Sequence, residues 1–539
     1  MLRFRTIAGV IAGVSMIAAM AGCKDDNKAK TAVLPNADSM SEHLDISISF
    51  WEIGKAFEKN DAVLQKIERD FNVTLKPVQV SYSDYVQKFQ VWAASDSFPD
   101  VFAHSIASDT PGIYSDWIKQ QLIRPLPDDL SKYPNVYQIA QIPDVRALAR
   151  DKKLYMLPRI AYPTNDLWML ERVVLIRKDW MNQLGLRDPK NFDQFSAMMQ
   201  AFAEKDPDGN GENDTVGLTA NSMNYLSWAF SPTFPQFAAS QWVHEEERWV
   251  PYYASTKMND VVSQFRKLYT SGGLDKDFTV MKEGDANEKF AQNKAGAFAF
   301  RATPAHLSEL EHLWNRYNPG KNFFDSVKIL HMWPADDGAR YYYVAPTYWT
   351  ETYFNAKLDD RKMDRIMRLY DYLLSPEGKK LMQYGIEGQD YKEEEEDKIV
   401  MIRPTDEKTG QSGSILKKYP SLEVFRSLAA WGQERYFELN DVNKLNLGEA
   451  NIQKSLEEMR WQLNNARAVP INYPIVSLPS PLKDKLSASI NPLDDLIKIT
   501  ISKDDPVAMW QETVKGYNNR GLQDMIVEIN QSIKPAEGK

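Results

Sequence analysis

Apolar and polar residues alternate over residues 44–50, which is the pattern of a half-buried β-strand. The apolar spacing then changes to that of a helix and back, so that helices and strands take turns. The predicted elements are a helix over 56–71, a strand over 73–78, a helix over 82–94 and a short buried strand at 101–102. This alternation predicts an α/β unit with a largely parallel sheet. Ligands collect at the carboxyl ends of such strands, which directs attention to Trp51 and to residues 103–105.

The rest of the chain continues with both kinds of element. A strand running into a helix is expected over 168–180, and further strands are expected over 295–300 and 327–332. Amphipathic helices are expected over 191–204, 257–269, 360–374, 450–466 and 507–529. The last third is therefore mostly helical, and no internal repeat is present.

The first residues form a separate segment with its own pattern. Arg3 and Arg5 precede an apolar run over 7–19, which predicts a secretory signal peptide over 1–22 and is too short for a membrane span. Cys23 follows Ala21-Gly22 and is the only cysteine in the chain. This resembles the lipobox of bacterial lipoproteins, in which the cysteine is lipidated and becomes the first mature residue. A plain secretory peptide with a chance cysteine is the alternative.

Composition narrows the classes of protein. Without the signal, 63 basic side chains stand against 74 acidic ones, a net charge of −11, so no nucleic acid is expected as a partner. Residues 23–43 have the composition of a flexible tether behind a lipid anchor. About 500 remaining residues are too many for one core, so two or more lobes are expected. Aromatic residues make up 12% of the chain, which suits core packing and equally a site that binds flat apolar faces.

Several segments resemble one known family. They are the lipobox, Phe98-Pro99-Asp100-Val101, residues 174–186, residues 206–211, Tyr384-Gly385-Ile386-Glu387-Gly388 and the last helix around Ala508-Met509-Trp510. Together they are similar to the extracellular solute-binding lipoproteins of carbohydrate ABC importers, in particular the large lipoproteins of Gram-positive-type bacteria. The resemblance runs over nearly the whole chain from Cys23.

The resemblance implies a periplasmic-binding-protein-like α/β fold with two lobes, a hinge and a ligand cleft between the lobes. The N-terminal lobe would take 44–168 and 332–388, and the C-terminal lobe 169–331 and 389–539. Crossings would lie near 168–171, 331–333 and 387–389. It also implies a monomer on the extracellular face of the membrane, with an oligosaccharide as ligand and ABC permease subunits as partners.

Residues 206–214 carry the sharpest chemical motif. Oxygen-bearing side chains recur at Asp206, Asp208, Asn210 and Asp214, and Gly211 stands where an EF-hand-like loop turns. Glu212 would contribute its backbone carbonyl. Position twelve of the loop is Gly217 rather than a bidentate Glu, so another oxygen must complete the shell. We expect structural calcium here; a solvated turn is the alternative.

A sugar offers an apolar face to aromatic rings and a rim of hydroxyls to polar side chains. The candidates lie at expected strand ends and crossings: Trp51, Asp100, His104, Ser105 and Tyr162 in the first lobe, Asn221, Trp228, Arg301 and Trp431 in the second, and Trp333 and Trp349 at the crossings. Trp228 and Trp431 match places where the family has a stacking ring. Each Trp is otherwise equally suited to the core, Asp100 to capping a turn, and Arg301 to pairing with a buried acid.

No catalytic site is expected. The six histidines lack metal-ligand spacing, and neither a nucleophile elbow, a P-loop nor a dinucleotide motif occurs. Glu171 and Glu387 near the expected hinge are best explained as structural carboxylates. The alternatives to an oligosaccharide receptor are a secreted hydrolase or lyase acting on carbohydrate, and a receptor of the same fold for a peptide or another solute.

Overall fold

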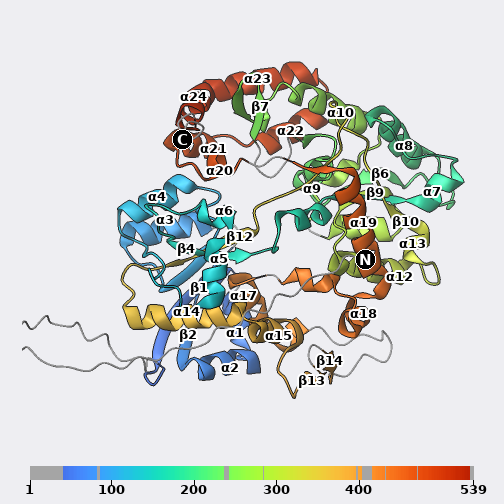
Figure 1. The fold of residues 1–539 in the computed structure, drawn as a ribbon. Coiled ribbons are helices and arrows are strands. Elements are labelled where there is room, and N and C mark those ends of the chain that lie inside the picture. The colour runs from blue at the N-terminus through green and yellow to red at the C-terminus, as the bar shows by residue number, and fades with distance from the viewer. Residues whose placement is uncertain are drawn as a thin grey trace, which may run out of the picture. The chain divides into compact units, whose positions relative to one another are not determined.

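The computed structural model describes residues 40–51, 53–81, 85–235, 242–282, 284–395, 398–402, 415–430, 432–469 and 472–533. Residues from Met40 onward form one compact unit. Two mixed sheets organise this unit (Figure 1). We call each sheet with the helices packed on it a lobe, the first lobe around the five-stranded sheet and the second around the four-stranded one.

The first sheet has the strand order β2-β1-β3-β12-β4. Its strands are β1 (Leu44–Trp51), β2 (Val73–Val80), β3 (Val101–His104), β4 (Met156–Ile160) and β12 (Tyr348–Phe354). β1 pairs in parallel with β2 and β3, as the alternation of elements predicts, whereas β12 enters antiparallel between β3 and β4. β12 comes nearly 190 residues after β4, so the chain leaves the first lobe and returns to it.

Helices of the first lobe bury their apolar faces against this sheet in one continuous core. They are α1 (Ile53–Glu58), α2 (Ala62–Asp70), α3 (Tyr85–Ser95), α4 (Pro111–Lys119), α5 (Pro134–Gln141), α6 (Pro143–Arg146), α14 (Asp360–Leu374), α15 (Pro376–Tyr384), α16 (Ile415–Lys418) and α17 (Ser421–Leu428). The helix expected over 56–71 is two helices, because Asn60 adopts a positive φ of 46° and Asp61 caps a new helix start.

The second sheet has the order β10-β5-β9-β6 and is buried on both faces. Its strands are β5 (Val173–Arg177), β6 (Val216–Thr219), β9 (Ala295–Phe300) and β10 (Val327–Ile329). Successive side chains point to opposite faces of a strand. Accordingly Val174 and Ile176 join one core cluster, and Val173 and Leu175 join another. Burial on both faces explains why these strands are continuous apolar runs.

Helices cover both faces of the second sheet. They are η1 (Asn165–Glu171), α7 (Lys178–Gln183), α8 (Phe192–Glu204), α9 (Met223–Ala229), η3 (Tyr252–Ala254), α10 (Met258–Thr270), η4 (Lys276–Thr279), α11 (Asp285–Ala291), α12 (Pro304–Tyr317), α13 (Phe323–Ser326), η5 (Gln433–Phe437), α18 (Asp441–Leu447) and α19 (Glu449–Asn465). The C-terminal helices are α20 (Tyr473–Ser477), α21 (Pro481–Ser487), α22 (Pro492–Ile501), α23 (Pro506–Asn518) and α24 (Leu522–Ile533). The helix expected over 507–529 is divided at Gly521, whose φ is 103°.

Three short strand pairs complete the fold: β7 (Trp242–Glu245) with β8 (Arg248–Pro251), β11 (Tyr341–Tyr342) with β15 (Arg467–Ala468), and β13 (Tyr391–Glu395) with β14 (Lys398–Met401). The C-terminal helices pack beside the β7–β8 hairpin although some 270 residues separate them (Figure 1). Asn530 holds this contact, since its side chain accepts from the amide of Trp249 and donates to the carbonyl of the same residue.

The chain crosses between the sheets in the η1 segment and again between β10 and β12. The sequence assigned all of 389–539 to the second lobe, but α16 and α17 lie in the first core. Ser421 explains this placement in part, because its backbone amide and hydroxyl both donate to Asp61 at the start of α2. The remaining lobe limits stay predictions.

Among the helices of the described residues, none combines the length and the apolar character that crossing a membrane requires. The signal segment over 1–22 lies outside the described residues.

Candidate functional site

A cavity of about 830 Å³ opens between residues of both lobes. The first lobe contributes Ser108, Asp109, Pro111, Tyr348 and Trp349. The crossing segments contribute Trp168, Glu171, Arg172, Tyr343, Ala345 and Pro346. The second lobe contributes Ser222, Asn224, Tyr225, Trp228, Arg301 and His306, and the hairpin and C-terminal helices add Trp242, Val476, Lys483, Asp484 and Ser487. The volume suits a ligand of several linked rings.

Aromatic rings and one arginine form the central wall. The guanidinium of Arg172 lies 4.0 Å from the ring centroid of Trp228 and 5.0 Å from that of Tyr343. Trp228 stands on α9, where Tyr225 precedes it by three residues and meets it edge to face at 6.0 Å. Helical spacing of three residues therefore presents both rings on one side of α9.

A buried polar cluster lies behind this wall and joins the lobes. Tyr162 of the first lobe donates its hydroxyl to Glu171 at 2.5 Å. Arg172 Nη1 and Arg301 Nε lie 3.9 and 3.7 Å from the same carboxylate. Burial disfavours the charged form of Glu171, but the two arginines and the hydrogen bond from Tyr162 favour it, and on balance its pKa is lowered. Glu171 is thus a structural carboxylate at the crossing.

His306 closes the cluster on the second lobe. Arg301 Nη1 contacts His306 Nε2 at 2.5 Å, and Thr303 Oγ1 contacts Nδ1 at 2.6 Å. Burial lowers the pKa of His306 to about 4, and the two arginines add to this effect. The imidazole is therefore neutral near pH 7.

A loop after β3 forms the wall on the first lobe. The carboxylate of Glu351, fully buried in β12, accepts hydrogen bonds from the amide of Ile106 (3.0 Å), the amide of Ala107 (3.3 Å) and the hydroxyl of Tyr353 (2.8 Å). Burial raises the pKa of Glu351 to about 7, and Asp109 adds to the rise. Asp109 is open to the cavity yet surrounded by protein atoms, and this desolvation raises its pKa to about 6.

Three residues predicted from the sequence line the cavity: Trp228, Arg301 and Trp349. Arg301 also pairs with a buried acid, which was the alternative considered for it. Both interpretations therefore apply to the same side chain.

Trp51, His104 and Ser105 lie one layer behind Trp349. The ring centroids of Trp51 and Trp349 lie 6.1 Å apart, and the guanidinium of Arg159 lies against both rings, 4.6 Å from Trp349 and 5.6 Å from Trp51. His104 stacks on Tyr85 with ring centroids 3.1 Å apart, and its Nδ1 accepts from the amide of Ser105. Burial lowers the pKa of His104 to about 3. These side chains support the cavity wall rather than form it.

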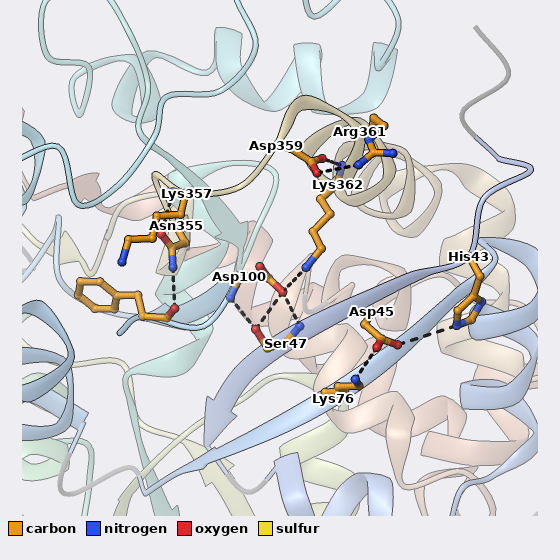
Figure 2. Close-up of polar contacts among 11 residues, drawn as sticks. His43, Asp45, Ser47, Lys76, Asp100, Asn355, Lys357, Asp359, Arg361 and Lys362 are labelled. Carbon is orange, nitrogen blue, oxygen red and sulfur yellow. Dashed lines mark hydrogen bonds and ion pairs between the residues drawn. The ribbon is translucent and has the colours of Figure 1, made fainter. Parts of the chain in front are cut away.

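The structure gives four other candidates structural partners away from the cavity wall. Asp100 accepts from the amide and hydroxyl of Ser47 and pairs with Lys362 at 3.1 Å (Figure 2). Asn221 holds the start of α11 by accepting from the amide of Ala286. Trp333 is buried among Phe192, Phe195 and Phe230 in the second core, and Tyr162 belongs to the buried cluster above. Trp431 and Cys23 lie outside the described residues.

Sequence reasoning missed the residues of the cavity that come from the crossing and from the C-terminal helices. Arg172 follows Glu171 at the expected hinge, which is a usable signal. No sequence signal marks Asp109, Lys483 or Asp484 as cavity residues, because residues 476–487 come to lie beside α4 only when the chain folds.

The predicted metal loop connects α8 to β6. Asp206 accepts from the backbone amides of Asn210 (3.1 Å) and Gly211 (3.0 Å). The side-chain amide of Asn210 donates to Asp208 (2.9 Å) and Asp214 (3.1 Å). Glu212 is exposed, and its backbone amide donates to Asn210. Within the described part of the chain, no group of three or more His, Cys, Asp or Glu side chains is arranged to hold a metal ion.

The sequence model of the family described as bacterial extracellular solute-binding protein matches residues 49–380, more than half of the chain. Lipoprotein LipO of Bacillus subtilis (strain 168) is 24% identical over 338 residues, 61% of this chain and 63% of LipO. The fructooligosaccharide ABC transporter substrate-binding protein FusA of Streptococcus pneumoniae serotype 4 (strain ATCC BAA-334 / TIGR4) is 30% identical over 169 residues, 30% of this chain and 31% of FusA. The chain thus spans less than two thirds of these curated relatives.

Solved structures share the fold over nearly the whole chain. The alginate-binding protein AlgQ2, solved without calcium ion, has a TM-score of 0.67 at 17% identity and covers 92% of this chain and 98% of its own. FusA of S. pneumoniae in complex with kestose has a TM-score of 0.64 at 15% identity, with coverage of 92% and 99%. The two-lobed α/β fold expected from the sequence is confirmed.

Proposed function

Because the chain belongs to the bacterial extracellular solute-binding protein family, we propose that it is the substrate-binding protein of an ABC importer and binds an oligosaccharide in the cavity between its lobes. Captured ligand would be delivered to the permease subunits of that importer. Relatives named for fructooligosaccharide and alginate support a carbohydrate ligand.

The observation that carries the proposal is the composition of the cavity wall. Rings of Trp228, Trp349 and Tyr343 supply flat apolar surfaces from both sides, and Asp109 supplies hydrogen-bond acceptors. A pyranose or furanose chain needs this combination of faces and polar partners. Because the ligand would contact both lobes, it would bind the closed state, in which the lobes are together, more tightly than the open state. It would shift the equilibrium towards the closed state by that difference in affinity.

A binding protein is favoured over a hydrolase or lyase. Glu171 is engaged by Tyr162, Arg172 and Arg301, while Glu387 is exposed beside β13, so this pair does not form a two-carboxylate catalytic site.

The test is a thermal-shift screen over purified oligosaccharides, with product analysis of each mixture. A true ligand at about one hundred times its Kd should raise the free energy of unfolding by about 2.7 kcal/mol while the sugar stays intact. Cleavage of the sugar would contradict the proposal, and so would a melting temperature that no carbohydrate changes.

We propose further that the 206–214 loop holds structural calcium. Asp206, Asp208 and Asp214 gather around Asn210, and Oδ1 of Asp208 is buried with no hydrogen-bond partner among the described residues. Burial raises the pKa of Asp208, and its carboxylate neighbours add to this. Calcium would supply the positive charge that this oxygen-rich loop lacks. Asn210 would present Oδ1 only after its amide turned over.

Removal of calcium should lower the melting temperature by several degrees, and added calcium should restore it. The variant Asp206→Asn should lose the response to chelator, whereas Asp193→Asn on the exposed side of nearby α8 should keep it. Equal melting temperatures with EDTA and with excess calcium would remove the metal from the proposal.

We propose that Cys23 is lipidated and holds the receptor at the extracellular face of the membrane. A lipoprotein among the relatives supports this anchor. The variant Cys23→Ser should move the protein from the membrane fraction to the medium with its ligand affinity unchanged. Retention of the variant in the membrane would contradict the anchor.

A further inference from the structure

The charged side chains that line the cavity are balanced in number. Asp109, Glu171 and Asp484 stand against Arg172, Arg301 and Lys483. His306 is the remaining titratable imidazole of the wall and is neutral near pH 7. The relatives do not decide the charge of a ligand, since one name refers to fructooligosaccharide, which is uncharged, and another to alginate, a polyuronate. Whether the cavity suits a charged or an uncharged ligand depends on which of these side chains are free to bind it.

Lys483 has its donors occupied by the protein. Its ammonium donates to the carbonyl oxygens of Ile475 (3.1 Å), Val476 (3.2 Å) and Leu478 (2.7 Å). An ammonium has three donors, so these three bonds use all of them. Burial also lowers the pKa of Lys483 to about 8. The residue therefore stabilises the end of α20 and offers a ligand carboxylate no hydrogen bond.

The two arginines are each held by protein groups, although the Nε of Arg172 is buried with no hydrogen-bond partner among the described residues. Arg172 is covered by Trp228 and Tyr343 and donates to the carbonyl of Glu171 at 2.6 Å. Arg301 contacts His306, and its guanidinium lies 4.9 Å from the ring centroid of Tyr225. The carboxylate of Glu171 lies within 4 Å of both and offsets half of their charge. The other half of their positive charge remains, but it lies against the rings of Trp228, Tyr343 and Tyr225.

The opposite wall presents carboxylates. Asp109 has the hydroxyl of Ser108 at 3.4 Å, and Asp484 accepts from the backbone amide of Gly112. Desolvation by the surrounding protein raises the pKa of both groups, although Asp109 itself is exposed to the cavity, so the charged form of each is already disfavoured. A saccharide with a carboxylate on every ring would bring further negative charge against this wall. Sugar hydroxyls would instead donate to Asp109.

On the premise that the cavity binds carbohydrate, we infer that its ligand is an uncharged oligosaccharide and that the two carboxylates of this wall, Asp109 of the first lobe above all and Asp484 of the second, discriminate against polyuronates. The rings of Trp228 and Trp349 take the apolar faces of the sugar. Asp109 accepts hydrogen bonds from the sugar hydroxyls and repels ligand carboxylates. One side chain thus supplies both an attractive and a repulsive contribution to selectivity.

Matched ligands test this inference. Oligogalacturonates, their methyl esters and uncharged fructo-, gluco-, galacto-, manno- and xylo-oligosaccharides of the same length would be compared by calorimetry and thermal shift. Binding is expected only in the uncharged set, with a Kd that changes less than about twofold over a tenfold range of salt, because no ion pair forms. A uronate that binds more tightly than its methyl ester would overturn the inference and leave the proposed function standing. Binding in neither set would overturn both.

The variant Asp109→Asn gives a second readout whose sign separates the alternatives. For an uncharged ligand it removes a charged acceptor, and the affinity should fall by about three- to tenfold. For a polyuronate it removes repulsion, so the affinity would rise, and a rise would overturn the inference. Asp116→Asn on the exposed face of α4 is the matched control and should leave the affinity unchanged.

Discussion

At the scale of single residues, the cavity shows how one side chain can serve both the fold and a ligand. Arg172 is fixed by two rings and by Glu171, and in turn it fixes the ring of Trp228 at the cavity wall. A cation over an aromatic face contributes on the order of 0.5–2 kcal/mol when it is partly desolvated. The wall is therefore preorganised, which lowers the entropy that a ligand must overcome.

Trp228 is expected to be a major contact for the ligand. Trp228→Ala should weaken binding by about three- to tenfold, because a stacked aromatic contact contributes about 0.5–1.5 kcal/mol, and Trp228→Phe should recover part of the loss. Trp461→Ala is the control, since that ring packs on His331 outside the cavity wall. Calorimetric titration measures the effect; equal losses in Trp228→Ala and Trp461→Ala would show that Trp228 is no ligand platform.

Glu351 links stability to pH at the same scale. Burial raises its pKa from 4.5 to about 7, so between these values the folded state holds a proton that the unfolded state has lost. The contribution of this group to stability is thus complete below pH 4.5 and is lost as the pH rises towards 7. Glu351→Gln cannot ionise and keeps an acceptor for Ile106 and Ala107.

The stability of Glu351→Gln relative to the wild type should therefore rise between pH 5 and pH 8, by up to about 3 kcal/mol. Denaturant unfolding at several pH values measures the difference. A difference that stays constant with pH would contradict the raised pKa.

At the scale of elements, one helix of each lobe meets the other at the edge of the cavity. Thr110 does not cap α4 with its side chain; Asp484 on α21 accepts from the amide of Gly112 instead. A Cβ on Gly112 would stand 1.6 Å from the carboxylate oxygen of Asp484. Nearby, Arg150 donates to the carbonyl of Ser477 at 2.7 Å. The second lobe thus provides the N-terminal cap of a first-lobe helix.

This contact should contribute to affinity because it exists only when the lobes are together. Asp484→Ala should weaken ligand binding by about fivefold, the equivalent of one lost cap. Gly112→Ala should weaken it at least as much, since the methyl group displaces α21 from α4. The exposed Asp524→Ala on α24 is the matched control. Unchanged Kd values in both Asp484→Ala and Gly112→Ala would show that the α4–α21 contact does not influence closure of the lobes.

At the scale of the whole molecule, two sheets with separate cores are joined by crossing segments whose polar groups are buried and paired. Tyr162, Glu171 and Arg301 come from the first lobe, the crossing and the second lobe, respectively. Breaking a buried charge cluster of this kind costs several kcal/mol, so relative motion of the lobes has to preserve it. We therefore expect the cluster to stay intact when the lobes move, and the α4–α21 contact to be the one that opens.

The pattern along the chain was enough for most elements. The helix predicted over 360–374 and the strand predicted over 295–300 agree with α14 and β9, because a strong apolar periodicity determines local structure without help from the rest of the chain. It failed where a single backbone conformation ends a helix, as at Asn60 and Gly521. The pattern also led to α17 being assigned to the wrong core, because amphipathic spacing shows that one face of a helix is buried but not which sheet it packs against.

The sequence by itself determined the fold class, the alternation of elements and the oxygen-rich loop at 206–214. It offered Trp228, Trp349 and Arg301 only as three of eleven candidates for the site, and the structure shows that these three line the cavity. Only the tertiary structure decided that Trp333 and Asn221 are structural and that Asp100 accepts hydrogen bonds from Ser47. It also decided that Lys483 and Asp484 line the same cavity as Asp109, which precedes them by some 370 residues in the sequence. The physical reason is that periodicity and composition are local quantities. A binding cavity is a set of contacts between distant segments, and the partner of each polar group exists only after the chain has folded.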